Sequence, residues 1–255
     1  MTIAERFRLD GRAALVTGAS RGLGAAIARA LAEAGANVVL HSSREEVREA
    51  ADAIAAECGV RTACVTADLS NPKAAGRLVE KAVAALGQVD ILVNNAGIIR
   101  RAPAAEYGDA EWDEVIEVNL SSVFRLSRAA AGGMLERRSG KIINIASLLS
   151  FQGGIRVPAY AAAKGAVAQL TKALANEWAA SGVNVNAIAP GYMVTDNTKP
   201  LIEDPVRYKD ITARIPAGRW GQPDDLAGAT VFLASAASDY VHGHVLVVDG
   251  GWMGR

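Results

Sequence analysis

The chain has 255 residues, and 51% of them are hydrophobic, so it can bury one large core. Lysine plus arginine and aspartate plus glutamate number 27 each, so no net charge would draw the chain to nucleic acid or an anionic membrane. The N-terminal stretch contains acidic residues and has no apolar centre, and the apolar runs are short, so we expect neither a signal peptide nor a membrane span.

The first expected strand, residues 12–17, leads directly into a glycine-rich turn and a helix. The turn reads TGASRGLG over residues 17–24, and an alanine-rich helical pattern follows it. Its glycines let the backbone approach a pyrophosphate, and the helix N-terminus offers free N–H groups and partial positive charge. A second strand is expected over residues 37–41, so the context predicts a dinucleotide site.

Strand and helix patterns alternate along the rest of the chain. Further strands are expected over 60–67, 89–97, 141–146, 183–189 and 244–248, and helices over 42–58, 71–87, 109–138, 159–178 and 224–235. Composition does not change along the way. The sequence therefore predicts an α/β fold, a single doubly wound (Rossmann) domain over 1–255 with a parallel seven-stranded sheet and helices on both faces.

Two features lie outside this alternation. Residues 196–222 are expected to be irregular, and Pro200, Pro205 and Pro216 would restrict them, so we predict a lid over the substrate. Cys58 and Cys64 are the two cysteines, and no second pair completes a zinc site. We expect free thiols in a reducing cytoplasm and no bound metal.

A hydroxyl, a phenol and an ammonium group are expected to meet near the middle of the chain. Tyr160 and Lys164 are four residues apart, which places them on one face of a helix. A cation near a phenol favours the phenolate, so Lys164 is expected to lower the pKa of Tyr160. Ser147 follows the strand over 141–146 and could reach the same substrate oxygen. This arrangement predicts proton exchange with an alcohol or a carbonyl group.

Six motifs in order resemble the short-chain dehydrogenase/reductase family over nearly the whole chain. They are TGASRGLG, NNAG at 94–97, Asn119, Ser147, YAAAK at 160–164 and PGYMVT at 190–195. The resemblance implies a catalytic tetrad of Asn119, Ser147, Tyr160 and Lys164, in which Asn119 holds a water that relays protons to Lys164. It also implies a nicotinamide cofactor lined by Thr17, Gly18, Ser20, Arg21, Gly22, Leu23, Gly24, Ser42, Ser43, Arg44, Asp68, Leu69, Asn95, Ala96, Gly97, Tyr160, Lys164, Pro190, Gly191, Met193 and Thr195.

The residues after the second strand bear on which nicotinamide cofactor binds. An acidic residue there would bond a ribose 2′-hydroxyl and favour NAD, but the chain has His41-Ser42-Ser43-Arg44. Arg21 and Arg44 could both meet a 2′-phosphate, which arginine suits. The sequence therefore favours NADP, with NAD as the alternative.

The second half of the chain resembles the branch of the family that acts on hexonates and deoxy-keto-hexonates in uronate breakdown. A sugar acid needs a cation for its carboxylate, and Arg100, Arg101 and Arg156 flank the expected site. The expected substrate-binding residues are Arg101, Gln152, Arg156 and Tyr192. The resemblance implies hydride transfer to or from a substrate of the 2-dehydro-3-deoxy-D-gluconate or 2-deoxy-D-gluconate type.

Other functions remain open at this point. One alternative is a reductase of a 4-deoxy-hexulose uronate or of 3-oxoacyl thioesters, and another is a non-catalytic module that senses dinucleotides. The resemblance also implies a cytoplasmic homotetramer built from the long helices and the last strand.

Overall fold

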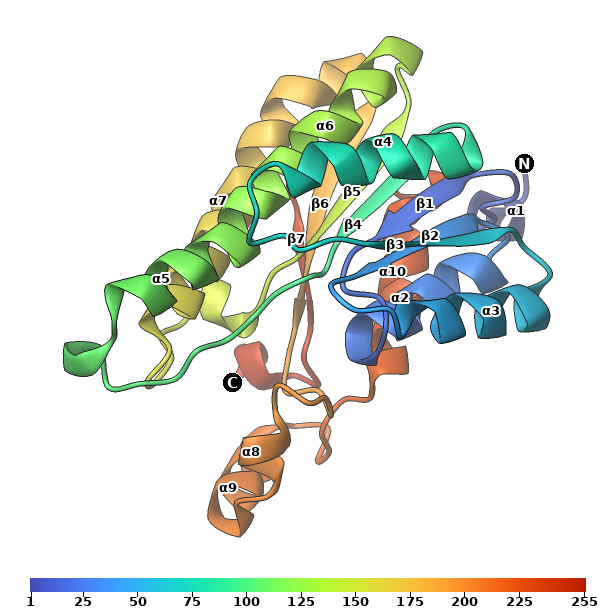
Figure 1. Cartoon of the computed structure of the whole chain (residues 1–255). Coiled ribbons are helices and arrows are strands. Elements are labelled where there is room, and N and C mark those ends of the chain that lie inside the picture. The colour runs from blue at the N-terminus through green and yellow to red at the C-terminus, as the bar shows by residue number, and fades with distance from the viewer.

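The computed structural model describes residues 1–255 as one sheet between two layers of helices (Figure 1). The strands are β1 (Ala13–Val16), β2 (Asn37–Ser42), β3 (Thr62–Thr66), β4 (Ile91–Asn94), β5 (Gly140–Ile145), β6 (Val183–Pro190) and β7 (Val245–Val248). All are parallel, in the order β3-β2-β1-β4-β5-β6-β7. The predicted doubly wound domain with seven parallel strands is confirmed.

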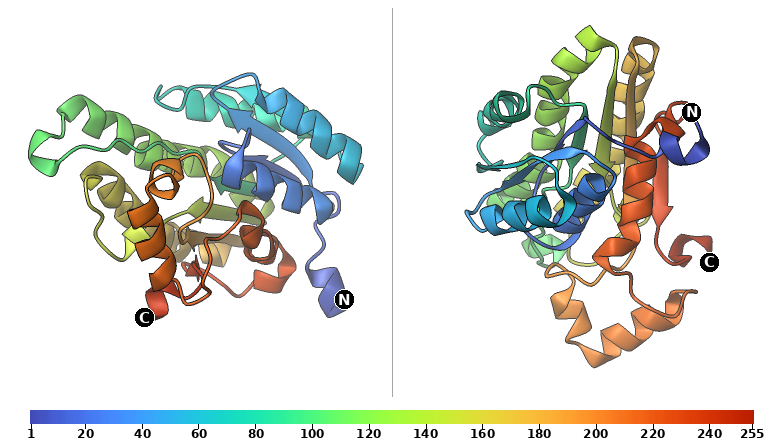
Figure 2. Two further views of the ribbon diagram at one scale, coloured as in Figure 1. Left: turned by 90° about the horizontal axis from the view of Figure 1, so that it is seen from below. Right: turned by 90° about the vertical axis from the view of Figure 1, so that its right-hand side faces the viewer.

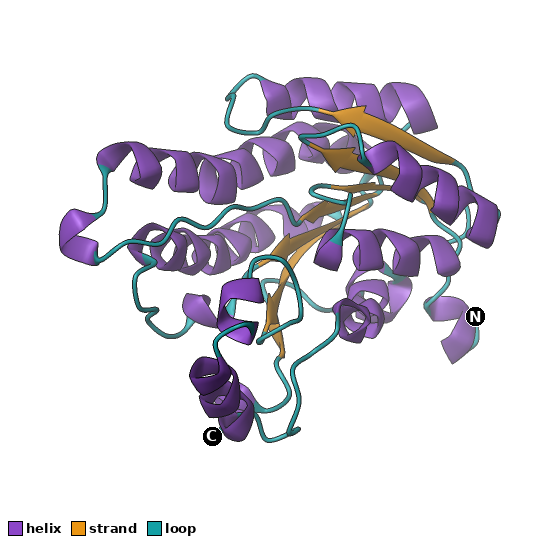
Figure 3. Ribbon diagram, turned by 60° about the horizontal axis from the view of Figure 1, so that its bottom comes forward, coloured by secondary structure: helices purple, strands orange, loops and turns teal.

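The helices divide between the two faces of the sheet. They are α1 (Ile3–Arg6), α2 (Gly22–Glu33), α3 (Val47–Cys58), α4 (Ala74–Leu86), α5 (Asp109–Ile116), α6 (Ser122–Arg137), α7 (Pro158–Trp178), α8 (Lys199–Ile202), α9 (Pro205–Arg214) and α10 (Ala227–Ala234). One layer contains α4, α6 and α7, and the other contains α2, α3 and α10, with the strands between them (Figure 3). No helix has both the length and the apolar character needed to cross a membrane.

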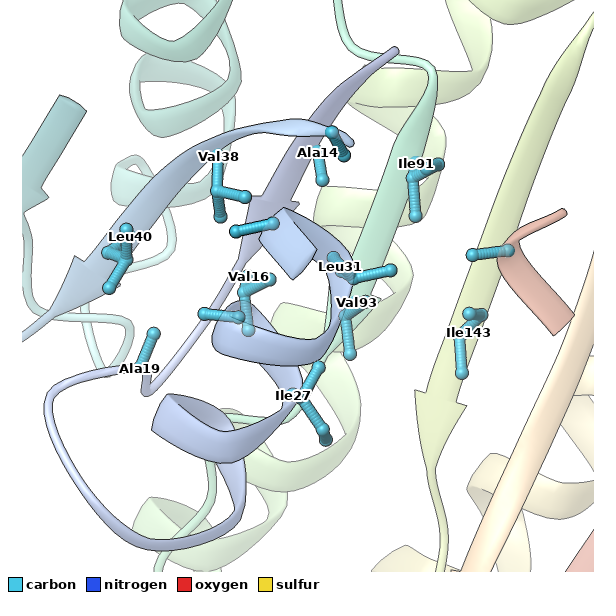
Figure 4. Close-up of a cluster of buried hydrophobic side chains, with 14 of the residues drawn as sticks. Ala14, Val16, Ala19, Ile27, Leu31, Val38, Leu40, Ile91, Val93 and Ile143 are labelled. Atoms are coloured by element: carbon cyan, nitrogen blue, oxygen red, sulfur yellow. The ribbon is translucent and has the colours of Figure 1, made fainter. Parts of the chain in front are cut away.

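Side chains alternate between the two faces along each strand, and those on each face pack into a separate hydrophobic core. On β1, Ala14 and Val16 belong to the cluster under α2, whereas Ala13 and Leu15 belong to the cluster under α4 and α6. Figure 4 shows the first cluster, in which Leu31 of α2 lies over the central strands. Burial on both faces explains why these strands read as continuous apolar runs.

The carboxyl ends of all seven strands meet at one edge of the sheet, where the site is expected. The strand order reverses between β1 and β4, which is where open α/β sheets bind ligands. Helices α8 and α9 project below this edge, in the orange part of the chain (Figures 1 and 2).

The expectation that 196–222 is irregular is wrong, because 199–202 and 205–214 are helical. The Asp204 side chain caps α9 by accepting from the N–H groups of Val206 and Arg207 at 3.0 and 3.1 Å. Pro205 occupies the first turn, where its missing N–H costs nothing. Pro200 and Pro205 therefore lie in the first turns of these helices, whereas Pro216 lies in the turn after α9.

Candidate active site

The glycine turn after β1 is held in place by the end of β4. The Asn95 side-chain amide donates to the carbonyl oxygens of Thr17 and Gly18 at 2.9 and 3.0 Å. The Thr17 hydroxyl accepts from the N–H groups of Asn95 and Ala96, both at 3.0 Å. A Cβ at Gly24 would lie 2.1 Å from the Gly18 carbonyl oxygen, so only glycine allows α2 to start this close to β1.

The start of α2 fits the pyrophosphate of a dinucleotide. Arg21 is the N-cap residue and its side chain makes no capping hydrogen bond, which leaves the first N–H groups of α2 without a side-chain acceptor. Gly22 has a φ of 57°, and a Cβ built there would meet only Thr195 Cγ2, at 3.8 Å. Leu23 packs its side chain against the core below. These groups can hold an anion over the turn.

The end of β2 supplies the groups expected at the cofactor's ribose. The Ser42 hydroxyl donates to the Ser20 hydroxyl at 3.2 Å and accepts from the Arg44 N–H at 3.2 Å. Ser43 and the Arg44 side chain are exposed. The structure thus brings the predicted serines and Arg44 beside the glycine turn.

The rest of the predicted cofactor set follows β3, β4 and β6. Leu69 is buried, and the Asp68 carboxylate accepts from the Ser70 N–H at 2.9 Å. Gly97 lies so close to Asn119 that a Cβ there would be 2.5 Å from Asn119 Oδ1. Beyond β6 the chain runs from Pro190 and Gly191 through Met193 to Thr195, along the same carboxyl edge of the sheet.

The predicted serine, tyrosine and lysine come together where β5 meets α7. Lys164 is 4% exposed, and its ammonium group donates to the Ile145 carbonyl oxygen at 2.5 Å and lies 5.6 Å from the centre of the Tyr160 ring. Ser147 caps the short helical turn after β5 by accepting from the Leu149 N–H at 3.2 Å. In that turn, Ser150 donates to the carbonyl oxygen of Lys164 at 2.7 Å, which ties it to α7.

Burial moves the pKa values of both titratable groups. It raises the pKa of the Tyr160 phenol, and the adjacent Ser147 hydroxyl and the charge of Arg101 lower it in part. Burial also lowers the pKa of Lys164 to about 8. The expectation of a lowered pKa for Tyr160 is therefore wrong for this structure, because desolvation of the phenolate outweighs the contributions of Ser147 and Arg101. At neutral pH Tyr160 holds its proton and can donate it.

Asn119 lies in a π-helical turn, Glu117–Ser121, between α5 and α6. Its side-chain amide donates to the carbonyl oxygens of Ile98 and Val115, both at 2.9 Å, and its oxygen accepts from the Ile98 N–H at 3.2 Å. The side chain thus fixes the segment after β4, and the water relay stays a prediction. Such turns in helices are frequent at functional sites.

The four predicted substrate residues are held by different contacts, and their role in substrate binding stays a prediction. Arg101 donates to the Asn197 carbonyl oxygen at 2.9 Å, and its charge acts on Tyr160. Arg156 has a φ of 64°, and its carbonyl oxygen accepts from the Ala102 N–H at 3.1 Å. Gln152 accepts from the Trp252 indole at 3.3 Å. Tyr192 packs on the same indole, with ring centres 4.7 Å apart.

Arg100, in contrast, is held away from this role. Its guanidinium forms two hydrogen bonds with the Glu114 carboxylate, at 3.0 and 2.9 Å. This bidentate pair uses the guanidinium N–H groups of Arg100 that a substrate carboxylate would need. Of the two adjacent arginines, Arg101 is therefore the candidate for substrate binding.

Sequence reasoning missed two residues that contact the cofactor side of the site. His41 is buried, its Nδ1 accepts from the Gly18 N–H at 3.4 Å, and its Nε2 bonds the Ala67 carbonyl oxygen at 3.0 Å. Burial lowers the pKa of His41 to about 4, so it is neutral at physiological pH and joins β2 to the turn and to β3. Asp196 forms an ion pair with Arg21 at 3.0 Å. His41 could have been found from the sequence, because it directly precedes the predicted cofactor residues Ser42, Ser43 and Arg44. No local pattern in the sequence indicates that Asp196 pairs with Arg21.

Together these groups can support hydride transfer at a carbonyl or alcohol carbon. The turn and the start of α2 have the free N–H groups that a dinucleotide needs, and a phenol, a hydroxyl and an ammonium lie along the same edge of the sheet. Among the side chains, no group of three or more His, Cys, Asp or Glu residues could hold a metal ion.

Comparison with known proteins identifies the family to which the chain belongs. Residues 18–253 match the family described as Enoyl-(Acyl carrier protein) reductase. The 2-dehydro-3-deoxy-D-gluconate 5-dehydrogenase of Bacillus subtilis (strain 168) is 54% identical over an alignment that covers 98% of each chain.

Two solved structures match equally closely in shape. One, a gluconate 5-dehydrogenase from Burkholderia cenocepacia J2315 in complex with NADP and tartrate, is 43% identical, with a TM-score of 0.95 and 100% of both chains covered. The other, from Beutenbergia cavernae, is provisionally assigned as an NAD(P)-dependent gluconate 5-dehydrogenase and holds NADP at low occupancy. It is 54% identical, with a TM-score of 0.95 over 98% of this chain and 100% of that one. The chain therefore belongs to the short-chain dehydrogenase/reductase family of oxidoreductases.

Proposed function

We propose that the protein is an NADP(H)-dependent oxidoreductase that interconverts a hydroxyl and a keto group of a hexonate or deoxy-keto-hexonate. The observation that carries this proposal is that the Ser147 hydroxyl lies beside the Tyr160 phenol and that the charge of Arg101 is near enough to lower the pKa of that phenol. A proton donor there meets a cation that suits a carboxylate substrate. The names of the relatives at 43% and 54% identity, gluconate and deoxy-gluconate dehydrogenases, support the substrate class.

The cofactor, when bound, supplies or accepts the hydride, and the side chains manage the substrate oxygen. In the reducing direction, Ser147 donates a hydrogen bond to the carbonyl oxygen and polarises it. Tyr160 gives its proton to that oxygen as negative charge develops there. Since burial keeps the phenol protonated at neutral pH, the free enzyme is ready for this direction.

Lys164 has two parts in this scheme. Its ammonium lies against the Tyr160 ring, where positive charge stabilises the phenolate that remains after proton transfer. It can also donate to the ribose next to the nicotinamide, as the family resemblance implies. Asn119 keeps the segment after β4 in place and, with a bound water, would return a proton to Lys164.

The choice of NADP rests on the cationic and hydroxyl groups at the end of β2. Arg44 is exposed beside the Ser20–Ser42 pair, and Arg21 is at the start of α2. Two guanidinium groups suit a dianionic 2′-phosphate better than a neutral hydroxyl. The relative from Burkholderia cenocepacia was crystallised with NADP, which supports this choice.

The substrate end is proposed to be closed by the lid over 196–222. Arg101 and Arg156 would bind the sugar-acid carboxylate, while Gln152 and Tyr192 would contact its hydroxyl groups. Arg101 already contacts Asn197 near the start of the lid, so one side chain connects the substrate to the covering segment. Closure would exclude water during hydride transfer.

We also propose a homotetramer that works in the cytoplasm, in the breakdown of uronates. A surface hollow over the long helices is lined by Leu120, Ser121, Phe124, Arg125, Arg128 and Leu170, and Phe124 is 39% exposed. Strand β7 is apolar, lies at the edge of the sheet and is only partly covered. Unpaired Cys58 and Cys64 suit a reducing compartment.

The proposal is tested by assaying purified protein against C6 keto-uronates and hexonates, a 4-deoxy-hexulose uronate and a 3-oxoacyl thioester, each with NADPH/NADP and NADH/NAD. We expect the highest kcat/KM for a hexonate or deoxy-keto-hexonate with the phosphorylated cofactor, and no turnover by Tyr160→Phe. Preference for the thioester or for the 4-deoxy-hexulose uronate would replace the proposal with that activity. Cofactor binding without turnover of any compound would indicate a sensing module.

A further inference from the structure

Arg21, one of the two arginines proposed to meet the cofactor's 2′-phosphate, is paired with a carboxylate of its own chain. Its guanidinium lies 3.0 Å from the Asp196 carboxylate, and the two side chains are 67% and 64% exposed. The residues are far apart in the sequence: Arg21 is at the start of α2, and Asp196 is the first residue of the 196–222 lid. An anionic ligand for Arg21 must therefore compete with Asp196.

The backbone around Asp196 is fixed by contacts that do not involve Arg21. Thr198 donates to the carbonyl oxygens of Met193 and Thr195 at 2.6 and 2.9 Å and accepts from the Thr195 N–H at 3.1 Å. The Val194 N–H donates to the Gly221 carbonyl oxygen at 2.8 Å. The Asp196 carboxylate is thus presented over the glycine turn by a compact structure of its own. Replacing its charge need not unfold that structure.

The chemistry of the two cofactors makes this competition selective. A phosphate dianion forms charge-assisted, bidentate hydrogen bonds with a guanidinium and can displace a carboxylate from it. A ribose 2′-hydroxyl carries no charge and offers Arg21 nothing that would replace the ion pair with Asp196. Only a cofactor with a 2′-phosphate would therefore separate Arg21 from Asp196.

We propose that Asp196 is a specificity-determining residue that occupies Arg21 in the free enzyme and is displaced by the cofactor's 2′-phosphate. This inference rests on the proposed NADP(H) function. It adds that NADP(H), but not NAD(H), must break the ion pair between Arg21 and Asp196 in order to bind.

The size of the effect follows from the exposure of the pair. An ion pair this exposed contributes about 0–1 kcal/mol, and 1 kcal/mol is about fivefold in a dissociation constant. Asp196→Asn should therefore tighten NADPH binding about two- to fivefold at low salt, because the competitor loses its charge. NADH binding should stay within about 1.5-fold, and the NADPH effect should shrink in 0.5 M salt.

The experiment measures dissociation constants of NADPH and NADH by fluorescence titration of the full-length protein. Four variants are compared with the wild type: Asp196→Asn, Arg21→Met, the double variant, and Asp210→Asn. Asp210 is an exposed aspartate on α9 in the same segment, so it controls for loss of one negative charge there. Asp196→Asn should tighten NADPH binding, Asp210→Asn should not, and in the Arg21→Met background Asp196→Asn should have little effect.

The outcomes separate this inference from the function on which it rests. If Arg21→Met weakens NADPH binding but Asp196→Asn behaves like Asp210→Asn, Asp196 does not compete and the inference is overturned while the NADP(H) function stands. If the wild type prefers NADH, the NADP(H) function and the inference both fall. If the wild type prefers NADPH but Arg21→Met leaves NADPH binding unchanged, only the inference falls, and the 2′-phosphate is held by other groups such as Arg44. Equal tightening in the presence and absence of Arg21 would reduce Asp196 to a general charge effect and also refute the competition.

Discussion

Replacing Lys164 with methionine is expected to abolish turnover and to remove a pH dependence from the stability of the fold. The ammonium group is buried, and burial lowers the pKa of Lys164 from its ordinary 10.5 to about 8. Between these two values the unfolded chain binds a proton that the folded chain has released. The free energy of unfolding of the wild type therefore rises with pH across this window.

The magnitude follows from the size of the shift. Each pKa unit corresponds to about 1.36 kcal/mol, so the wild type should gain about 2–3 kcal/mol between pH 7 and pH 10 from this group alone. Methionine has a similar length and does not titrate, so the variant lacks the gain. At any single pH the comparison is less informative, because methionine removes both the desolvation of the ammonium and its hydrogen bond to Ile145.

The assay is urea unfolding of both proteins at pH 7, 8, 9 and 10, at one protein concentration because assembly would make stability concentration-dependent. Other titrating groups are common to the two proteins and cancel in the difference. The wild type minus variant difference should rise with pH in favour of the wild type. A difference that stays constant within about 0.5 kcal/mol, on the usual precision of such extrapolations, would refute a lowered lysine pKa.

Four further outcomes are expected. Tyr160→Phe should lower kcat by about 10²-fold or more and leave the cofactor dissociation constant unchanged, since it removes only the proton donor; a loss below tenfold would contradict that role. Arg44→Ala should raise the KM for NADPH and leave that for NADH unchanged, and a wild type that strongly prefers NADH would contradict this. Trypsin should cut the free enzyme in the lid, at sites such as Arg207, Lys209 and Arg214, more slowly when cofactor and a sugar acid are bound; equal rates would argue against closure. Light scattering at micromolar concentration should give the mass of four chains, whereas a species of 26.5 kDa would be a monomer.

The sequence predicts the sheet, the glycine turn and the meeting of Ser147, Tyr160 and Lys164, because each depends on local patterns. A buried parallel strand needs a continuous apolar run, and a phosphate-binding turn needs glycine at positions such as Gly24, where any side chain would clash. These requirements are visible in single stretches of chain. The fold and its site edge follow from them by the rules for parallel sheets.

Two predictions from the sequence were wrong: the lowered pKa of Tyr160 and the irregular structure of residues 196–222. The raised pKa of Tyr160 depends on how completely the folded chain surrounds the phenol, and the spacing from Lys164 contains no information about that. Helix α9 was predictable, since Asp204-Pro205 is a capping residue followed by a first-turn proline. The pairing of Arg21 with Asp196 depends on how β6 ends relative to α2, which only the assembled sheet determines.

The segment that contains α8 and α9 leaves and re-enters the body of the protein at nearly one point. Beside the Val194–Gly221 contact, the Gly221 N–H donates to the Tyr192 carbonyl oxygen at 2.9 Å. An insertion whose ends are already joined can change length or sequence at little entropic cost to the sheet below. The aromatic residues Trp220 and Tyr208, stacked with ring centres 5.6 Å apart, anchor α9 from within the insertion itself. The substrate preference could therefore be changed by replacing the whole segment that contains α8 and α9, with β6 and the proton-transfer residues left as they are.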